Sequence, residues 1–172
     1  FLSDWSDSMN DGDGSKARVT AHSVAAMLEG LNDFSRIVAE SSKALGYDVD
    51  LDTKTGVIGF GNAAHTLKPL GKDLTTQDRC RVATSVANPL KEGTADFLAL
   101  DEVSSFYENN PNFDPGHKKI VMVLTDGQSN DVGKLATALA RIRKIPNLTV
   151  YAIGIQDFNA KKNYAPNGTT IT

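Results

Sequence analysis

The segment "DWSDSM" near the N-terminus carries oxygen-bearing side chains at every second position, Asp4, Ser6 and Ser8. In an extended chain, alternate side chains point to the same side, so these three would converge on one small volume while Trp5 and Asp7 face away. Such a cluster could form a hydrogen-bonded loop, part of a catalytic centre, or three corners of a site for a hard metal ion.

Two more oxygen-bearing residues are expected at the same place. The run "KIVMVLT", residues 119–125, is continuously apolar, as is typical of a strand covered on both faces, and Asp126 follows it directly. Asp4 follows the apolar pair Phe1-Leu2, which reads as the end of another strand. Because ligands bind outside the carboxyl ends of strands in open parallel sheets, we expect both carboxylates at one edge of the sheet. Thr94, in a Gly-Thr turn before a predicted helix, can reach this edge as well.

The remaining sequence supplies the elements that would position these residues. Apolar residues that recur every three or four positions predict amphipathic helices, and short apolar runs bounded by turn signals predict strands. The expected helices are a long one ending at Gly46, one over about 75–86, one starting just after Thr94 and one from Val132 to Ile142, and the expected strands are 55–60, 64–70 (ended by Pro69), 119–125 and 148–155. This alternation predicts an α/β fold with a doubly wound, mostly parallel sheet and helices on both faces.

Length and composition indicate a single soluble domain over residues 1–172. With 40% apolar and 23% charged residues, the composition is that of a globular protein. The formal net charge of −3, without a basic block, gives no reason to expect nucleic acid as a partner. The longest apolar run is too short to cross a bilayer, so we expect no membrane insertion by this domain. Because the sequence opens on the end of a strand, we expect a domain excised from a larger protein.

Three short motifs, taken in order, resemble the von Willebrand factor A domain, also called the integrin I domain. They are Asp4-x-Ser6-x-Ser8-Met9, Gly93-Thr94 and Thr125-Asp126-Gly127, and the stretch "VIGFGNAAHTLKPL" is similar to the second and third strands of that family. The resemblance implies a metal-ion-dependent adhesion site (MIDAS), in which two loop serines, a threonine in some states, and two aspartates hold the ion directly or through water. It assigns these roles to Ser6, Ser8, Thr94, Asp4 and Asp126, and implies no catalytic residue.

The chemistry of this set supports a hard cation independently of the resemblance. Oxygen donors without sulfur or imidazole favour hard ions, and a site with few protein ligands suits Mg²⁺, or Mn²⁺, better than Ca²⁺. An open coordination position could then take an anionic oxygen, so we expect a protein ligand that presents a carboxylate. Trp5, Asp7 and Asn10 would border the contact, although Trp5 could equally cover the sheet edge.

Several features depart from the family or have a plainer reading. Most members have glycine at the position of Asp7, whose carboxylate is expected to face water. Residues 158–172 are polar and lack helical periodicity where the family continues with a strand and a helix, so this C-terminal edge is atypical. The acidic stretch 48–52 lacks the glycine and glutamate of an EF-hand loop and fits a half-exposed strand or turn better. The three histidines show no ligand spacing, and the single Cys80 excludes an internal disulfide.

Three classes of function remain. The leading expectation is a non-enzymatic adhesion or protein-recognition module, extracellular or at the cell surface. The second is a cytoplasmic scaffold, because the resemblance also extends to domains in metal-chelatase and ubiquitin-related assemblies. The third is a metal-dependent hydrolase, but the sequence has no G-x-S-x-G elbow, no phosphate-binding glycine loop and no evident base for the serines. An aspartyl-phosphate route would also need an acid in place of Ser6.

Overall fold

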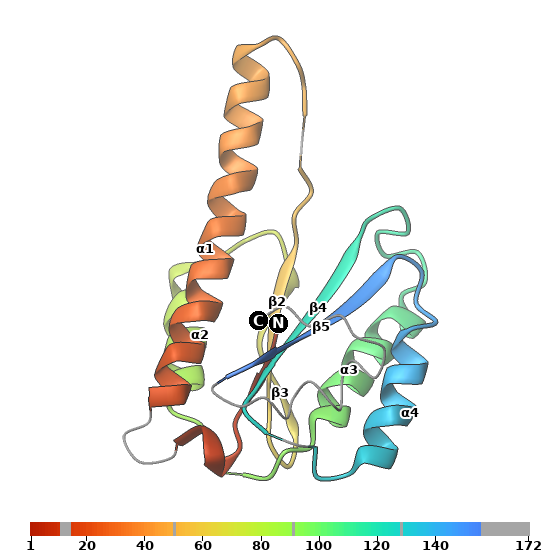
Figure 1. Ribbon diagram of the computed structural model, residues 1–172. Helices are drawn as coiled ribbons and strands as arrows, with labels where there is room; N and C mark the ends of the chain where they lie inside the picture. The colour runs from red at the N-terminus through yellow and green to blue at the C-terminus, as the bar shows by residue number, and fades with distance from the viewer. Residues whose placement is uncertain (11–14, 50, 91, 128, 156–172) are drawn as a thin grey trace.

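The computed structural model describes residues 1–10, 15–49, 51–90, 92–127 and 129–155. Its centre is a five-stranded sheet in the order β3-β2-β1-β4-β5 (Figure 1). β2 and β3 pair antiparallel, and all other neighbouring strands pair parallel. The strands are β1 (Leu2–Asp4), β2 (Thr55–Phe60), β3 (Ala64–Gly71), β4 (Lys119–Thr125) and β5 (Leu148–Gly154). The predicted, mostly parallel sheet is confirmed.

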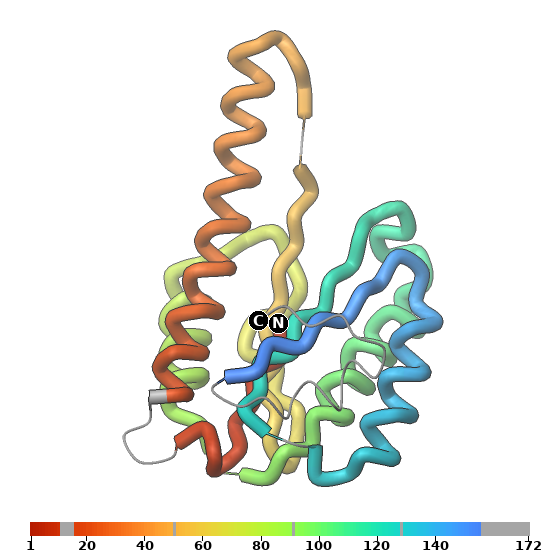
Figure 2. Tube along the Cα trace, in the orientation of Figure 1, coloured from red at the N-terminus to blue at the C-terminus, as the bar shows by residue number. Residues whose placement is uncertain are grey.

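Helices cover both faces of this sheet, as predicted. α1 (Ser15–Ala44) and α2 (Thr76–Ala87) pack together on one face, and α3 (Asp96–Asn109) and α4 (Val132–Ile142) pack on the other (Figure 2). Val123 and Leu124 of β4 belong to different apolar clusters, because successive strand residues point to opposite faces. The first cluster lies under α3 and α4, and the second lies under α1 and α2.

β1 lies between β2 and β4, and this position decides where the oxygen-bearing residues meet. Leu2 pairs with Ile58 of β2 on one side and with Val123 of β4 on the other. Because β1 and β4 are parallel neighbours, Asp4 and Asp126 follow them at the same edge of the sheet.

Pro69 does not end its strand, contrary to the expectation. β3 runs through this residue to Gly71 and lies at the edge of the sheet. An edge strand tolerates proline because the missing N–H can lie on the side that has no partner strand. The β2–β3 register also shifts on both sides of Val57, which pairs with Lys68 beside the proline. The prediction that Pro69 ends the strand was therefore wrong, and the proline lies instead in an irregular edge strand.

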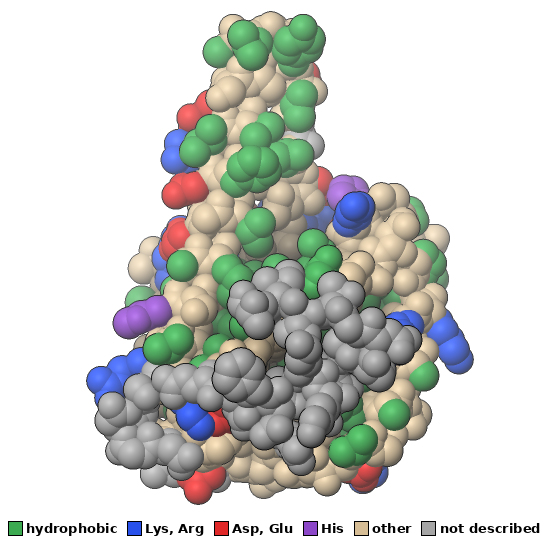
Figure 3. All heavy atoms as spheres, in the orientation of Figure 1, with side chains coloured by type: hydrophobic (Ala, Val, Ile, Leu, Met, Phe, Trp, Pro, Cys, Tyr) green, Lys and Arg blue, Asp and Glu red, His purple; other side chains and the backbone are tan. Residues whose placement is uncertain are grey.

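The second half of α1 projects beyond the sheet (Figure 1). In the first half, Val24 and Leu28 are only 0% and 3% exposed, whereas Phe34 and Ile37 in the second half are 57% and 52% exposed. Hydrophobic side chains are visible along this projecting part (Figure 3). The chain turns at Gly46, with a φ of +79°, so the helix ends where the sequence predicted. Apolar spacing predicted the helix, but it does not reveal whether another element covers the apolar face.

The chain returns from α1 to β2 through residues 47–49 and 51–54, which have no regular secondary structure. Within the described ranges, none of the helices combines the length and the apolar character that crossing a membrane requires. The atypical segment 158–172 lies outside the described residues.

Trp5, directly after β1, is buried in the sheet layer with 5% of its surface exposed. Its ring stacks on His65, with the ring centroids 5.4 Å apart and an interplanar angle of 24°. The ring also covers Gly59 of β2, where an added Cβ would lie 2.4 Å from two ring carbons. Trp5 therefore covers the sheet, the alternative expected above, and does not offer an exposed contact surface.

Alanine substitutions at Leu28 and Leu45 should separate the packed part of α1 from the projecting part. Leu28 is 3% exposed, and Leu45, just after the helix, is 74% exposed. Leu28→Ala should lower the free energy of unfolding by about 2–5 kcal/mol because it leaves a cavity, whereas Leu45→Ala should change it by less than about 0.5 kcal/mol. Chemical denaturation of the two variants measures both values. Equal losses would mean that the projecting part is packed in solution.

A second pair of variants tests the packing of Trp5. Gly59→Ala should displace the indole and lower the free energy of unfolding by roughly 1–3 kcal/mol, because the added methyl group overlaps the ring. In the control Gly30→Ala, the new Cβ meets nothing within 4 Å, and helix propensity should raise stability by about 0.5–1 kcal/mol. Trp5 is the only tryptophan, so its fluorescence should shift to the red in Gly59→Ala alone. Unchanged emission would contradict the stacking.

Candidate metal site

Asp4 ends β1 with its carboxylate inside the protein, where the residue is 1% exposed. Thr125 Oγ1 donates to Asp4 Oδ2 at 2.5 Å, and the Ser6 N–H donates to Asp4 Oδ1 at 2.8 Å. Burial raises the pKa of Asp4, and these hydrogen bonds act in the opposite direction. In the described part of the chain, no Lys, Arg or His forms an ion pair with this carboxylate. A bound cation would therefore offset the cost of burying its charge.

The two serines reach the site by a route that differs from the expected extended chain. The extended backbone continues only to Ser6, which forms a β-bridge with Glu92, and the 3-10 helix η1 (Asp7–Asn10) follows. The Met9 N–H donates to the Ser6 carbonyl at 3.1 Å, so a tight turn brings Ser8 back beside Ser6. The two hydroxyl oxygens lie 2.9 Å apart. The hydroxyls therefore meet because the backbone turns, and not because alternate residues of an extended strand point to the same side.

Asp126 follows β4 and joins this group. The residue is 3% exposed, and Ser8 Oγ donates to Asp126 Oδ1 at 2.7 Å. Hydrogen bonds therefore connect Ser6, Ser8 and Asp126, while the residue before Asp126 holds Asp4. Loops after β1 and β4 together bring two carboxylates and two hydroxyls to one edge of the sheet.

Thr94 lies on a third loop that packs against the other two. The Thr94 carbonyl accepts the N–H of Asn130 at 2.9 Å, and the next residue, Ala95, donates its N–H to Gly61 at 2.9 Å. Gly93 permits this close approach, because a Cβ there would lie 2.4 Å from Asn130 Nδ2. Thr94 is buried at the same sheet edge, although, within the described residues, its hydroxyl does not hydrogen-bond to the other four predicted ligands.

Lys16, in the first turn of α1, was not singled out from the sequence. Its Nζ lies 2.6 Å from Asp126 Oδ2 and 3.3 Å from the carbonyl oxygen of Ser8. The lysine side chain is 20% exposed and the Asp126 side chain only 1%. A signal for this contact was present, because a cation in the first turn of a helix opposes the helix dipole and suggests that a carboxylate compensates it.

The three residues expected to border a partner differ in exposure. Asp7 is exposed, in agreement with the expectation that its carboxylate faces water, and Asn10 is partly exposed. Trp5 is buried against Gly59 and His65, as described above. The loop that leaves the site therefore presents Asp7 and Asn10, and keeps Trp5 beneath them in the packing.

A second polar cluster lies at the other end of the parallel strands, just before β2 and β4 begin. Ligand atoms of Asp52, Asp114 and His117 all lie within 4.8 Å of one another, so these residues could also hold a metal ion. Lys54 Nζ, however, lies 2.6 Å from Asp52 Oδ2 and 2.6 Å from Asp114 Oδ2, and Lys72 pairs with the other oxygen of Asp52 at 2.8 Å. The hydrogen bond from Lys54 is the largest cause that lowers the pKa of Asp52 to about 2. Sequence spacing could not reveal this cluster, because Asp52 lies about 60 positions before the loop that carries Asp114 and His117.

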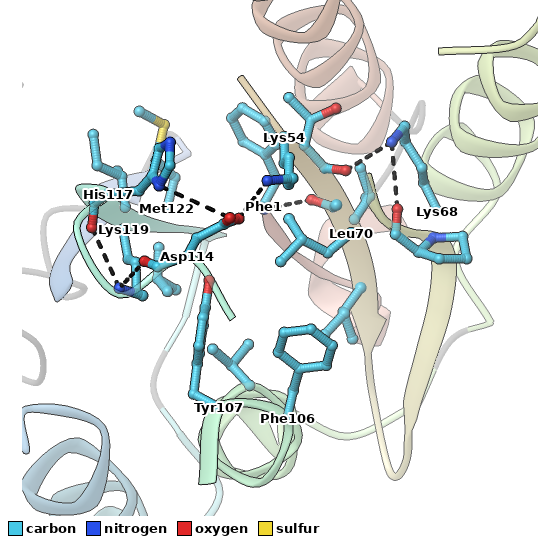
Figure 4. A pocket seen from close by; sticks show the side chains of 18 of the residues that line it. Phe1, Lys54, Lys68, Leu70, Phe106, Tyr107, Asp114, His117, Lys119 and Met122 are labelled. Atoms are coloured by element: carbon cyan, nitrogen blue, oxygen red, sulfur yellow. Dashed lines mark hydrogen bonds and ion pairs between the residues drawn. The ribbon is translucent and has the colours of Figure 1, made fainter. Parts of the chain in front are cut away.

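This second cluster lies at the mouth of a cavity of about 620 Å³ between β2, β4 and α3. Figure 4 shows Lys54 and His117 pointing toward Asp114, with Phe106 and Tyr107 of α3 on the cavity wall. Lys68 also lines the cavity and donates to the carbonyl of Thr55 at 2.7 Å. The ammonium groups of Lys54 and Lys68 are thus engaged with protein oxygens, and the cavity offers mainly apolar surface.

The oxygen cluster at the Asp4 edge fits a small, hard, divalent cation. Its donors are carboxylate and hydroxyl oxygens, and two buried carboxylates supply the charge that such an ion requires. The second cluster includes an imidazole, and its two carboxylates already share an ammonium group. The ligands that would hold a hard ion, directly or through water, are Asp4, Ser6, Ser8, Thr94 and Asp126.

Solved structures with a similar fold include proteins that were determined with a metal ion. A von Willebrand factor type A protein from Catenulispora acidiphila has a TM-score of 0.66 and 20% identity, over 96% of this chain and 34% of that one. The manganese-loaded TRAP protein of Plasmodium vivax has a TM-score of 0.59 and 21% identity, over 99% and 63%. Proximal thread matrix protein 1 of the mussel byssus, with a zinc-occupied MIDAS motif, has a TM-score of 0.57 and 25% identity, over 98% and 40%.

This chain spans less than two thirds of the length of each of these three proteins. The family model of the von Willebrand factor type A domain matches residues 1–166, which is nearly the whole chain. The order of the strands and the convergence of the three loops agree with that match. The chain therefore belongs to the von Willebrand factor type A family, whose domains are protein-interaction modules.

Proposed function

We propose that this domain is a divalent-cation-dependent recognition module that binds an acidic group of a protein partner through a metal ion. The observation that carries the proposal is the convergence of two buried carboxylates, Asp4 and Asp126, with the hydroxyls of Ser6 and Ser8. Lys16 pairs with Asp126, so the burial of the Asp4 carboxylate remains costly without a further cation. A divalent ion between them would balance both charges.

Mg²⁺ or Mn²⁺ is the proposed ion. Oxygen donors favour hard cations, and a site with few protein ligands suits an ion that keeps several waters better than it suits Ca²⁺, which takes six to eight oxygen ligands. The manganese in the Plasmodium vivax protein and the zinc in the mussel protein support a divalent ion in this fold.

The proposed partner presents a Glu or Asp side chain to the ion. Neutral hydroxyls complete part of the coordination shell without adding charge, so a position remains that an anionic oxygen fills better than water or an amide. Asp7 and Asn10 lie on the loop that leaves the site and would border the contact. The exposed carboxylate of Asp7 would disfavour a second acidic group of the partner and so contribute to selectivity.

We propose that the domain acts outside the cell or at its surface, with a cytoplasmic scaffold as the alternative setting. A metal-dependent hydrolase is less well supported. Ser8 donates to Asp126, but Asp126 also pairs with an ammonium group, and a carboxylate so engaged is a weak base for activating a serine. The proposed function is therefore binding without catalysis.

Metal binding should raise the melting temperature of the domain. An ion that binds only the folded state at 100 times its dissociation constant adds about 2.7 kcal/mol, which corresponds to a shift of roughly 5–10 °C for a domain of this size. Asp4→Asn and Asp126→Asn should abolish the shift with Mg²⁺ or Mn²⁺, and Asp48→Asn, at an exposed carboxylate, should retain it. Thermal denaturation with and without EDTA provides the measurement. Identical metal responses in all four proteins would rule out this site.

The open coordination position can be tested with small ligands. Mn²⁺ bound to the domain should enhance the relaxation of water protons, because at least one coordinated water exchanges with the solvent. Acetate should reduce this enhancement by displacing water, and acetamide at the same concentration should have little effect, since its oxygen carries no charge. Equal effects of the two compounds would argue against a carboxylate-binding position.

A further inference from the structure

We propose that Lys16 is a built-in countercation of the metal site. Its ammonium group holds the Asp126 carboxylate when no ion is bound, and a divalent ion must displace it to use that carboxylate. The inference rests on the proposed function, because it concerns how the same site changes between its metal-free and metal-bound states. It assigns to Lys16 control over the affinity of the site for metal.

Protein groups already engage the Asp126 carboxylate. Lys16 Nζ lies 2.6 Å from Oδ2, and Ser8 Oγ donates to Oδ1 at 2.7 Å, so both carboxylate oxygens are engaged. The same ammonium group lies 3.3 Å from the carbonyl oxygen of Ser8. Among the described residues, it is therefore held by two oxygens that belong to the loops of the site, as a small cation would be.

Burial makes this ion pair more than a surface contact. The Asp126 side chain is 1% exposed and would be left as an unpaired buried charge without the lysine. The first turn of α1 is also an unfavourable place for a cation, because the helix dipole repels it there. The contact with Asp126 offsets both costs, so the domain can fold without bound metal.

The lysine and a divalent ion compete for one carboxylate. An ammonium group that remained on Asp126 would lie within contact range of the ion, and the two positive charges would repel each other. The lysine side chain is 20% exposed and has a flexible four-carbon stem, so its charged end can move into water. Metal binding therefore exchanges a protein cation for a divalent ion, and the exchange lowers the observed affinity.

If Lys16 instead helped the site to bind metal, its removal would change the metal affinity in the opposite direction. If Lys16 only held Asp126 in place for the ion, its removal would disorder the carboxylate and weaken metal binding. Competition instead requires that removal of the charge strengthens metal binding and destabilises the metal-free domain. The sign of the change in affinity therefore separates the two roles.

The experiment compares Lys16→Met and Lys16→Gln with the wild-type chain. Methionine keeps most of the apolar stem, and glutamine keeps a neutral hydrogen-bond donor if the first variant folds poorly. Lys43→Met is the matched control, because it removes an exposed lysine from the far end of the same helix and changes the net charge equally. Titration calorimetry gives the dissociation constant for Mn²⁺, and melting in EDTA gives the stability of the metal-free form.

Both Lys16 variants should bind Mn²⁺ about tenfold more tightly than wild type and should melt at a lower temperature in EDTA. Lys43→Met should stay within about twofold of the wild-type affinity. Unchanged or weaker Mn²⁺ binding by the Lys16 variants, or an equal gain in Lys43→Met, would overturn the inference while leaving the metal site intact. Absence of Mn²⁺ binding in wild type and in every variant would overturn the proposed function itself.

Discussion

The parallel pairing of β1 with β4 is the contact on which the candidate site depends. Leu2 and Ser3 pair with Val123 and Leu124, so segments about 120 positions apart in the sequence end side by side. This register lets Thr125, the last residue of β4, donate to the carboxylate of Asp4. A shift of one residue would turn Thr125 to the other face of the sheet and leave that carboxylate without its donor. The packing of the sheet therefore sets the positions of both carboxylates before any ion binds.

A lysine compensates carboxylate charge at both ends of the sheet, although the carboxylates are buried only at the first. At the carboxyl ends of the strands, Lys16 pairs with Asp126, and at the opposite edge Lys54 lies between Asp52 and Asp114. The two ammonium groups differ in what surrounds them. Lys54 is shared by two carboxylates, whereas Lys16 faces a cluster in which the other carboxylate, Asp4, is held by neutral donors. Only the first edge therefore combines an uncompensated buried carboxylate with hydroxyl donors, among the residues that the structure describes.

The sequence was most informative where one local pattern decides one element. The continuous apolar run of β4 and the spacing of apolar residues in α4 predicted those elements with the observed bounds. A strand inside a covered sheet is expected to be continuously apolar, and a helix that packs on one face is expected to have apolar residues at periodic positions. The proximity of Asp4 and Asp126 followed from the general rule for parallel sheets. Patterns failed where tertiary context decides, as with Pro69 in an edge strand and Ser8 in a 3-10 turn. The contacts of Lys16 and of Asp52 were out of reach, because each joins segments that sequence spacing cannot relate.

The packing of α1 determines how an ion could replace Lys16 at the site. Ala17, Ala21 and Val24 follow Lys16 along the helix and are at most 4% exposed, so close packing fixes the backbone that carries the lysine. The projecting half of the helix lacks such contacts, but it begins several turns away and cannot loosen the first turn without disturbing Leu28 in the core. A shift of the whole helix would cost the packing of this apolar cluster, whereas release of Lys16 from Asp126 breaks one ion pair and leaves the backbone in place. The proposed exchange between ammonium and metal would therefore require the movement of one side chain, while the packing of α1 and the pairing of the strands stay unchanged.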